Sequence, residues 1–246
     1  MKSYNGAYLV ADYPDRERFI SAALKSLEFF DFLEIGIPFS DPVSDGTVIA
    51  KAAYDVIESG VKFNDIMKSI DEIKSKIPAD RKLYVMTYAN HIYHRGIQNF
   101  GKIMNDHGIS GMIIPDIPFI ESRRFTDIFE QQGLEFIYFI TPESKPEQIK
   151  QIAQSAKGFI YSVSMRGITG SSMNLKADIK TAVADAKTQT KVPVVLGFGI
   201  RDVESCKNAL ETADGFIIGT RMIELLNEDA DNSSFNKFVE ELKAKF

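Results

Sequence analysis

The sequence has little or none of several features that mark other classes of protein. It contains one cysteine, Cys206, so no internal disulfide can form, and it contains no tryptophan. No stretch approaches the ~18 consecutive apolar residues that a membrane-spanning helix needs. The N-terminal sequence MKSYNGAYLV has neither a long apolar region nor a small-residue cleavage site. These absences predict a soluble, cytoplasmic protein with no membrane association.

The charged residues give no sign of a nucleic-acid or lipid surface. The 29 basic and 34 acidic side chains leave a net charge of −5, and the two signs are interspersed along the chain. No basic patch that would attract nucleic acid or an anionic membrane is apparent. His91 and His94 lie close together, but no third ligand accompanies them, so we predict no metal site.

Short apolar runs alternate with segments of helical periodicity from one end of the chain to the other. The runs are rich in β-branched and aromatic residues and lack polar alternation, which suits strands buried on both faces of a parallel sheet. The eight predicted strands are Ala7–Ala11, Phe32–Ile37, Lys82–Thr87, Gly111–Ile114, Glu135–Ile140, Gly158–Ser162, Val192–Gly197 and Asp214–Ile218.

The segments between the runs predict helices. Apolar residues between Phe63 and Ile77 follow the i, i+3, i+4, i+7 spacing of one helical face. Asp202 is placed to cap a helix over Val203–Leu210. Eight strand–helix units favour a (β/α)₈ barrel, with a doubly wound open sheet as the main alternative. No linker or low-complexity stretch divides the chain, so we expect one domain over residues 1–246.

The segment LEIGIPFSDPVSDG, residues 33–46, carries the most chemical information. It places Glu34 inside an apolar strand and Asp45 in the loop that follows. A buried carboxyl group is costly unless it is paired, hydrogen-bonded or used in chemistry. One reading is a general acid/base with a pKa raised by burial. The alternatives are a structural carboxylate at Glu34 and an ordinary turn or helix-capping residue at Asp45.

Glycines follow the last three predicted strands, where barrel enzymes often bind phosphate. The loops contain RGITGSS at 166–172, GFGI at 197–200 and Gly219-Thr220, which opens a short helix through Leu226. Glycine lets backbone N–H groups approach an anion, and a helix N-terminus adds a favourable dipole. Tight turns are the alternative explanation for these glycines.

Two further residues lie at the predicted strand ends. Tyr88, after the third strand, is expected either to hydrogen-bond the substrate or Glu34, or to pack at the rim. Asp116, in Pro115-Asp116-Ile117-Pro118, is expected either to belong to the site or to shape its turn.

These motifs, in this order, resemble one family, the tryptophan synthase α subunits. The resemblance rests on LEIGIPFSDPVSDG, YANHIYHRG, IIPDIPFIES, RGITG, GFGI and IIGTRMI, and covers nearly the whole chain. It implies retro-aldol cleavage of indole-3-glycerol phosphate to indole and glyceraldehyde 3-phosphate in tryptophan biosynthesis. Glu34 would then act as the acid/base at the indole C3 and the glycerol hydroxyl, and Asp45 would hold the indole N–H.

The resemblance also implies the remaining site residues and the partner. The residues expected to bind substrate are Tyr88, Tyr161, Ile49, Thr169, Gly170, Phe198, Gly199, Gly219 and Thr220. Phosphate would lie on the backbone of Gly170, Gly199, Gly219 and Thr220, Phe198 and Ile49 would help line the indole pocket, and the Thr169 loop would close as a lid. No cofactor is implied. The implied partner is the pyridoxal-phosphate β subunit, in an α₂β₂ complex.

Two departures from the family pattern and two rival functions remain open at this point. Only Met1–Gly6 precede the first strand, where the family usually has a helix over the barrel floor, so the floor is expected to be partly open or covered in another way. In the lid loop Met165 stands where the family often has arginine, and Arg166 follows.

The rival functions are a non-catalytic phosphate-binding barrel that activates a partner and another sugar-phosphate barrel enzyme.

Overall fold

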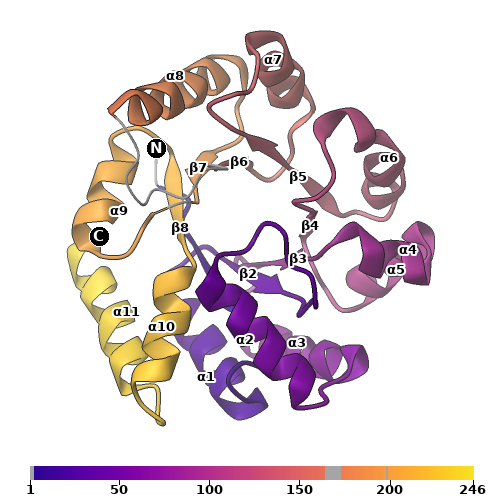
Figure 1. Ribbon diagram of the computed structural model, residues 1–246, viewed down its shortest axis with the longest axis vertical. Coiled ribbons are helices and arrows are strands. Elements are labelled where there is room, and N and C mark those ends of the chain that lie inside the picture. Colours follow the sequence, from indigo (N-terminus) through magenta and orange to yellow (C-terminus); the bar gives the residue numbers. More distant parts are fainter. Residues whose placement is uncertain (1–2, 164–172, 198) are drawn as a thin grey trace.

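The computed structural model describes residues 3–163, 173–197 and 199–246. Eight parallel strands form a closed barrel in sequence order, with β1 paired to both β2 and β8. Figure 1 shows the ring of strands at the centre and the helices around it. The predicted (β/α)₈ barrel is therefore confirmed, and the open sheet is excluded.

The eight strands lie at or within two residues of the predicted bounds. They are β1 (Gly6–Val10), β2 (Phe32–Gly36), β3 (Lys82–Met86), β4 (Gly111–Ile113), β5 (Glu135–Ile140), β6 (Ile160–Ser162), β7 (Val194–Leu196) and β8 (Gly215–Ile218). Most of their residues are buried, because the barrel interior covers one face and the helices cover the other.

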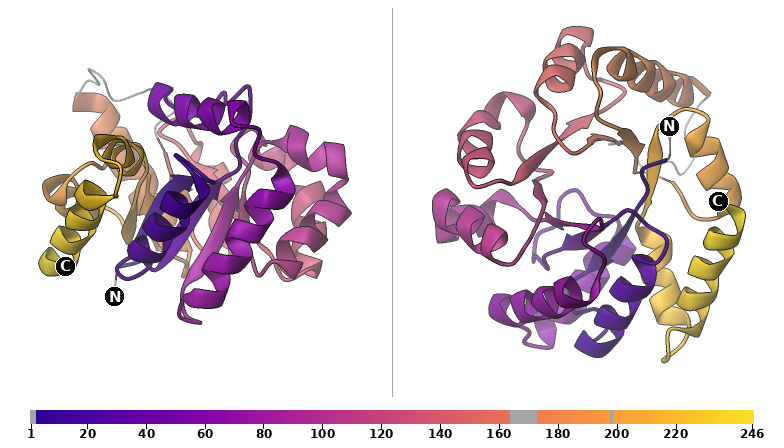
Figure 2. Two further views of the ribbon diagram at one scale, coloured as in Figure 1. Left: turned by 90° about the horizontal axis from the view of Figure 1, so that it is seen from below. Right: turned by 180° about the vertical axis from the view of Figure 1, so that it is seen from behind.

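The helices of the described residues fill the connections between strands. They are α1 (Arg16–Ser26), α2 (Thr47–Glu58), α3 (Phe63–Lys76), α4 (Ala89–Arg95), α5 (Ile97–Asp106), the 3₁₀ helix η1 (Phe119–Glu121), α6 (Arg123–Gln131), α7 (Pro146–Ser155), α8 (Met173–Gln189), α9 (Val203–Leu210), α10 (Thr220–Glu228) and α11 (Ser233–Lys245). Asp202 caps α9 by accepting a hydrogen bond from the Ser205 N–H, as predicted. In the side view of Figure 2, α2 lies across one end of the barrel and the chain ends lie toward the other.

Four aromatic side chains cover the floor, the end at which the strands begin. Phe32 stacks between Tyr4 and Phe159, with ring centroids 4.9 Å from each, and the Tyr84 ring lies edge-on to Phe32 and Phe159. The Tyr84 hydroxyl donates a hydrogen bond to Glu135 at 2.6 Å. Of the two expectations for the floor, an opening or a different cover, the structure shows the different cover.

Truncating this floor should destabilise the fold. The Phe159 side chain is fully buried, so Phe159→Ala should lower the free energy of unfolding by about 3–5 kcal/mol through lost apolar burial and the cavity left behind. Urea unfolding followed by circular dichroism measures it. Ile120→Ala is the control, because its side chain is 85% exposed and should change stability by less than about 0.5 kcal/mol. A cost below about 1 kcal/mol for Phe159→Ala would contradict a packed floor.

Candidate active site

Glu34 projects from the middle of β2 into the barrel. Its side chain is 1% exposed, and its carboxyl Oε2 accepts a hydrogen bond from the Tyr161 hydroxyl at 3.2 Å. Burial raises the pKa of Glu34 to about 8, because desolvation disfavours the charged form more than the Tyr161 bond favours it. At neutral pH this carboxyl group is therefore largely protonated, and it can serve as an acid.

Asp45 lies in the loop between β2 and α2. Its Oδ2 accepts a hydrogen bond from the Tyr88 hydroxyl at 3.0 Å, and the same hydroxyl accepts one from the Ser44 N–H at 3.2 Å. Partial burial raises the pKa of Asp45 to about 6, against the lowering effect of the Tyr88 bond. The residue that caps α2 is Gly46, so Asp45 does not have the capping role that its sequence position allowed.

The two acids form one unit with two tyrosines. The charge of Asp45 contributes to the raised pKa of Glu34, which shows that the two carboxyl groups lie within electrostatic range. Tyr161 holds Glu34, and Tyr88 holds Asp45. Of the alternatives that the sequence left for Tyr88, the bond to Glu34 is not formed, because the loop brings Asp45 to the Tyr88 hydroxyl. Two carboxyl groups with pKa values of about 8 and 6 suit a division between acid and base.

The second part of the site lies at the ends of β7 and β8. Gly199 is exposed with φ +73°, a backbone conformation that favours glycine, and Gly219 precedes the first turn of α10, which begins at Thr220. Ile49 of α2 faces this point, because a Cβ added at Gly219 would lie 3.8 Å from its Cδ1. The arrangement combines a free glycine backbone with a helix N-terminus, which is suited to an anion.

Several predicted residues lie outside the described residues. They are Thr169, Gly170 and Phe198, together with Met165 and Arg166 of the lid loop.

Two rim residues differ from the sequence interpretation. Asp116 accepts hydrogen bonds from the Ala89 N–H at 3.1 Å on both carboxylate oxygens, so it fixes the start of α4. Tyr8 of β1 was missed: it is Glu34's register partner, and its ring lies against Gly36. Alternation along β1 turns Tyr8 to the same side as Gly6 and Val10, but only the pairing with β2 shows that this side carries Glu34.

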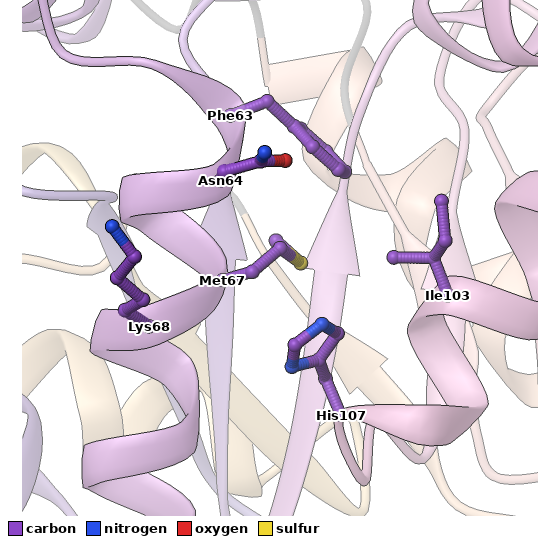
Figure 3. Close-up of a pocket in the computed structure, with 6 residues that line it drawn as sticks. All are labelled: Phe63, Asn64, Met67, Lys68, Ile103 and His107. Carbon is purple, nitrogen blue, oxygen red and sulfur yellow. The ribbon is translucent and has the colours of Figure 1, made fainter.

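Two hollows lie elsewhere on the molecule. One, of about 240 Å³, lies between α3 and α5 and is lined by Phe63, Asn64, Met67, Lys68, Ile103 and His107 (Figure 3). The other, of about 500 Å³, is lined by residues of α2 and α10 with Tyr13. Neither includes Glu34 or Asp45. Across the described residues, His, Cys, Asp and Glu form no group of three that could hold a metal ion.

Comparison with known proteins fixes the family. The family model described as "Tryptophan synthase alpha chain" matches residues 6–245. The chain belongs to the tryptophan synthase alpha chain family. The α subunits of this family are lyases that cleave indole-3-glycerol phosphate in tryptophan biosynthesis, so the resemblance drawn from the sequence motifs is confirmed.

Relatives and solved structures agree with this assignment. The tryptophan synthase alpha chain of Christiangramia forsetii is 36% identical over 242 residues, which cover 96% of this chain and 93% of that one. The alpha chain of Petrotoga mobilis is 35% identical, covering 87% and 81%. Among solved structures, the tryptophan synthase complex from Pyrococcus furiosus matches with a TM-score of 0.86 and 27% identity, covering 99% of both chains. A tryptophan synthase from M. tuberculosis matches at 0.87 and 26%, covering 99% and 92%.

Proposed function

We propose that this chain cleaves indole-3-glycerol phosphate with Glu34 as the acid/base and Asp45 as the partner of the indole N–H. Family membership supports the reaction, and the raised pKa values of the buried Glu34 and the partly buried Asp45 support the assignment of roles. The observation that carries the proposal is the Glu34 carboxyl group, which is 1% exposed yet retained inside the barrel with a pKa of about 8.

The proposed reaction needs two proton transfers. A proton added to C3 of the indole ring gives a cationic indolenine, and Asp45 stabilises that charge as it develops at the ring nitrogen. The hydroxyl on the adjacent chain carbon then loses its proton, its oxygen forms the aldehyde C=O, and the electrons of the breaking C–C bond return to the ring. Glu34, protonated at the start, supplies the first proton and is then ionised to accept the second.

The remaining residues hold the substrate in this proposal. The backbone at Gly199, Gly219 and Thr220, with Gly170, binds the phosphate, and the dipole of α10 favours the anion. Ile49 and Phe198 line the indole side, and the loop at Thr169 covers the substrate. Tyr88 and Tyr161 keep the two acids in place, as their hydrogen bonds indicate.

A β subunit is the proposed partner. One structure similar to this chain is a tryptophan synthase complex, from Pyrococcus furiosus, which supports a partner subunit. The proposed assembly is α₂β₂, with indole passing from one subunit to the other. In the described part of the chain, every helix is too short or too polar to span a bilayer. We place the protein in the cytoplasm, where its substrate and partner would be found.

Indole release from indole-3-glycerol phosphate tests the function directly. The purified chain, assayed with and without a tryptophan synthase β subunit, should release indole slowly alone and faster with the partner. Release in neither condition would overturn the lyase proposal. Binding without turnover in both conditions would instead favour a non-catalytic activating subunit, and activity lost with EDTA would favour a different sugar-phosphate enzyme.

The pH dependence of kcat/KM should show both acids, because this parameter reports the pKa values of the ligand-free enzyme. Asp45 must be ionised and Glu34 protonated, so kcat/KM should fall below about pH 6 and above about pH 8. Tyr88→Phe removes the hydrogen bond that lowers the pKa of Asp45, so the acidic limb should move to higher pH. The phosphate of the substrate also titrates near pH 6, but its pKa does not depend on Tyr88, so Tyr88→Phe cannot shift an acidic limb that is due to the phosphate. An unchanged acidic limb in Tyr88→Phe would contradict the assignment to Asp45.

A further inference from the structure

Tyr8 bridges the two halves of the candidate site. Its ring begins beside Gly219, where an added Cβ would lie 3.5 Å from Tyr8 Cβ and 3.6 Å from Cδ1. It ends at Gly36, where an added Cβ would lie 2.2 Å from the Tyr8 hydroxyl oxygen. Gly36 follows Glu34 by two residues on β2, so both face the same side of the strand. The hydroxyl therefore lies at the acid end of the site, and the base of the ring lies at the phosphate end.

The Tyr8 hydroxyl differs from the other two tyrosines of the site. Tyr161 donates to Glu34 and Tyr88 donates to Asp45, whereas the Tyr8 hydroxyl has no hydrogen-bond partner within the described residues. The side chain is 6% exposed, so the ring is fixed by packing. A fixed hydroxyl inside a site, with no partner among the described residues, is available to a ligand.

A substrate that spans the site must pass Tyr8. The three-carbon chain of indole-3-glycerol phosphate joins its phosphate to its indole ring and carries two hydroxyl groups. With the phosphate at Gly219 and the indole at Asp45, that chain crosses the Tyr8 ring, and its indole-proximal hydroxyl comes to the Gly36 end. Ile49, which also faces Gly219, offers only apolar contact there.

We propose that the Tyr8 hydroxyl hydrogen-bonds a hydroxyl group of the substrate's three-carbon chain and thereby selects hydroxylated chains over plain alkyl chains. This inference rests on the proposed function. The bond orients the hydroxyl whose proton Glu34 removes, so Tyr8 acts as a substrate-orienting residue and takes no part in the proton transfers themselves.

The test compares two ligands on matched variants. The first ligand is indole-3-glycerol phosphate, and the second is 3-indolylpropyl phosphate, the same molecule without its chain hydroxyls. Binding of both is measured by calorimetry on Glu34→Gln, which leaves the substrate intact, and on Glu34→Gln with Tyr8→Phe. Tyr4→Phe on the same background is the control, because it removes a tyrosine hydroxyl at the barrel floor, far from the site.

Tyr8→Phe should weaken binding of indole-3-glycerol phosphate by about 3- to 10-fold, the size of one lost hydrogen bond. Binding of 3-indolylpropyl phosphate should change by less than about 2-fold, and Tyr4→Phe should change neither. Equal weakening of both ligands would overturn the proposal in favour of a packing role, and an unchanged affinity for both would show that the hydroxyl contacts no substrate group. Failure of the proposed function would show separately, as absence of indole release by the unmodified chain.

Discussion

Glu34→Gln should release indole from indole-3-glycerol phosphate about 100- to 10,000-fold more slowly than the unmodified chain, the range expected when a general acid/base is removed. Glutamine keeps the shape of the side chain and can still accept the Tyr161 hydrogen bond, but it cannot transfer a proton at C3. Steady-state release in the presence of the β subunit measures the effect. Binding of 3-indolylpropyl phosphate is the control and should be preserved, because that ligand needs no proton transfer.

The same variant should reveal the energetic cost of the buried acid. The pKa of Glu34 is raised from 4.5 to about 8 in the folded chain. Between these pH values the folded state keeps a proton on Glu34 that the unfolded state has lost. The stabilisation that comes from the protonated Glu34 carboxyl group is therefore complete below pH 4.5 and is lost by about pH 8. The loss is about 1.4 kcal/mol per pH unit in this window.

Glutamine does not titrate, so the melting temperature of Glu34→Gln relative to the unmodified chain should rise from pH 5 to pH 8. Differential scanning calorimetry across this range gives the comparison. A difference in melting temperature that stays constant with pH would show that Glu34 is ionised in the folded chain. In the activity assay, substantial indole release by the variant would show that another group supplies the proton.

The architecture and one of the acids could be read from the sequence because they follow from local patterns. Continuous apolar runs such as Glu135–Ile140 must be buried on both faces, and that run is a strand with the predicted bounds. Glu34 was recognised as a candidate site residue because a carboxyl group is rarely buried inside such a run unless it is paired or functional. Asp202 was recognised as a helix cap because that role depends on residues only three positions away.

The contacts between the rim residues could not be read in this way. Tyr88 and Asp45 are 43 residues apart, and their hydrogen bond depends on the path of the loop between β2 and α2. Asp45 was therefore not among the partners that the sequence suggested for Tyr88. The sequence could not show whether Asp116 belongs to the site or has a structural role, because the Ala89 N–H that donates to it is 27 residues away.

The aromatic floor could also not be predicted from the sequence. Tyr4, Phe32, Tyr84 and Phe159 come from four separate segments, and none of them alone suggests an aromatic cluster. Only closure of the barrel brings their rings together, because the strand register fixes which inward side chains share a layer. Tyr8 was missed for a related reason: it is an unremarkable aromatic in β1 until pairing places it beside Glu34.

Gly197→Ala should lower the activity of the site without changing any polar group. A Cβ at this position would lie 1.7 Å from Cε2 of Tyr161 and 2.6 Å from its hydroxyl oxygen, so the ring must move. The Tyr161 ring stacks on Phe139 with centroids 5.2 Å apart and lies 5.8 Å from Phe159, so it has little room. Its hydrogen bond to Glu34 should break, and kcat/KM should fall by about 10- to 100-fold, the effect of misplacing a catalytic group by about 1 Å.

Two measurements separate this mechanism from general damage to the site. The Tyr161 bond lowers the pKa of Glu34, so its loss should move the alkaline limb of the kcat/KM profile to higher pH, in Gly197→Ala as in Tyr161→Phe. Gly46→Ala is the control at the same end of the barrel, because an added Cβ there meets nothing within 4 Å, and its activity should stay near that of the unmodified chain. A Gly197→Ala variant that loses activity with an unmoved alkaline limb would show that Tyr161 does not set the protonation of Glu34.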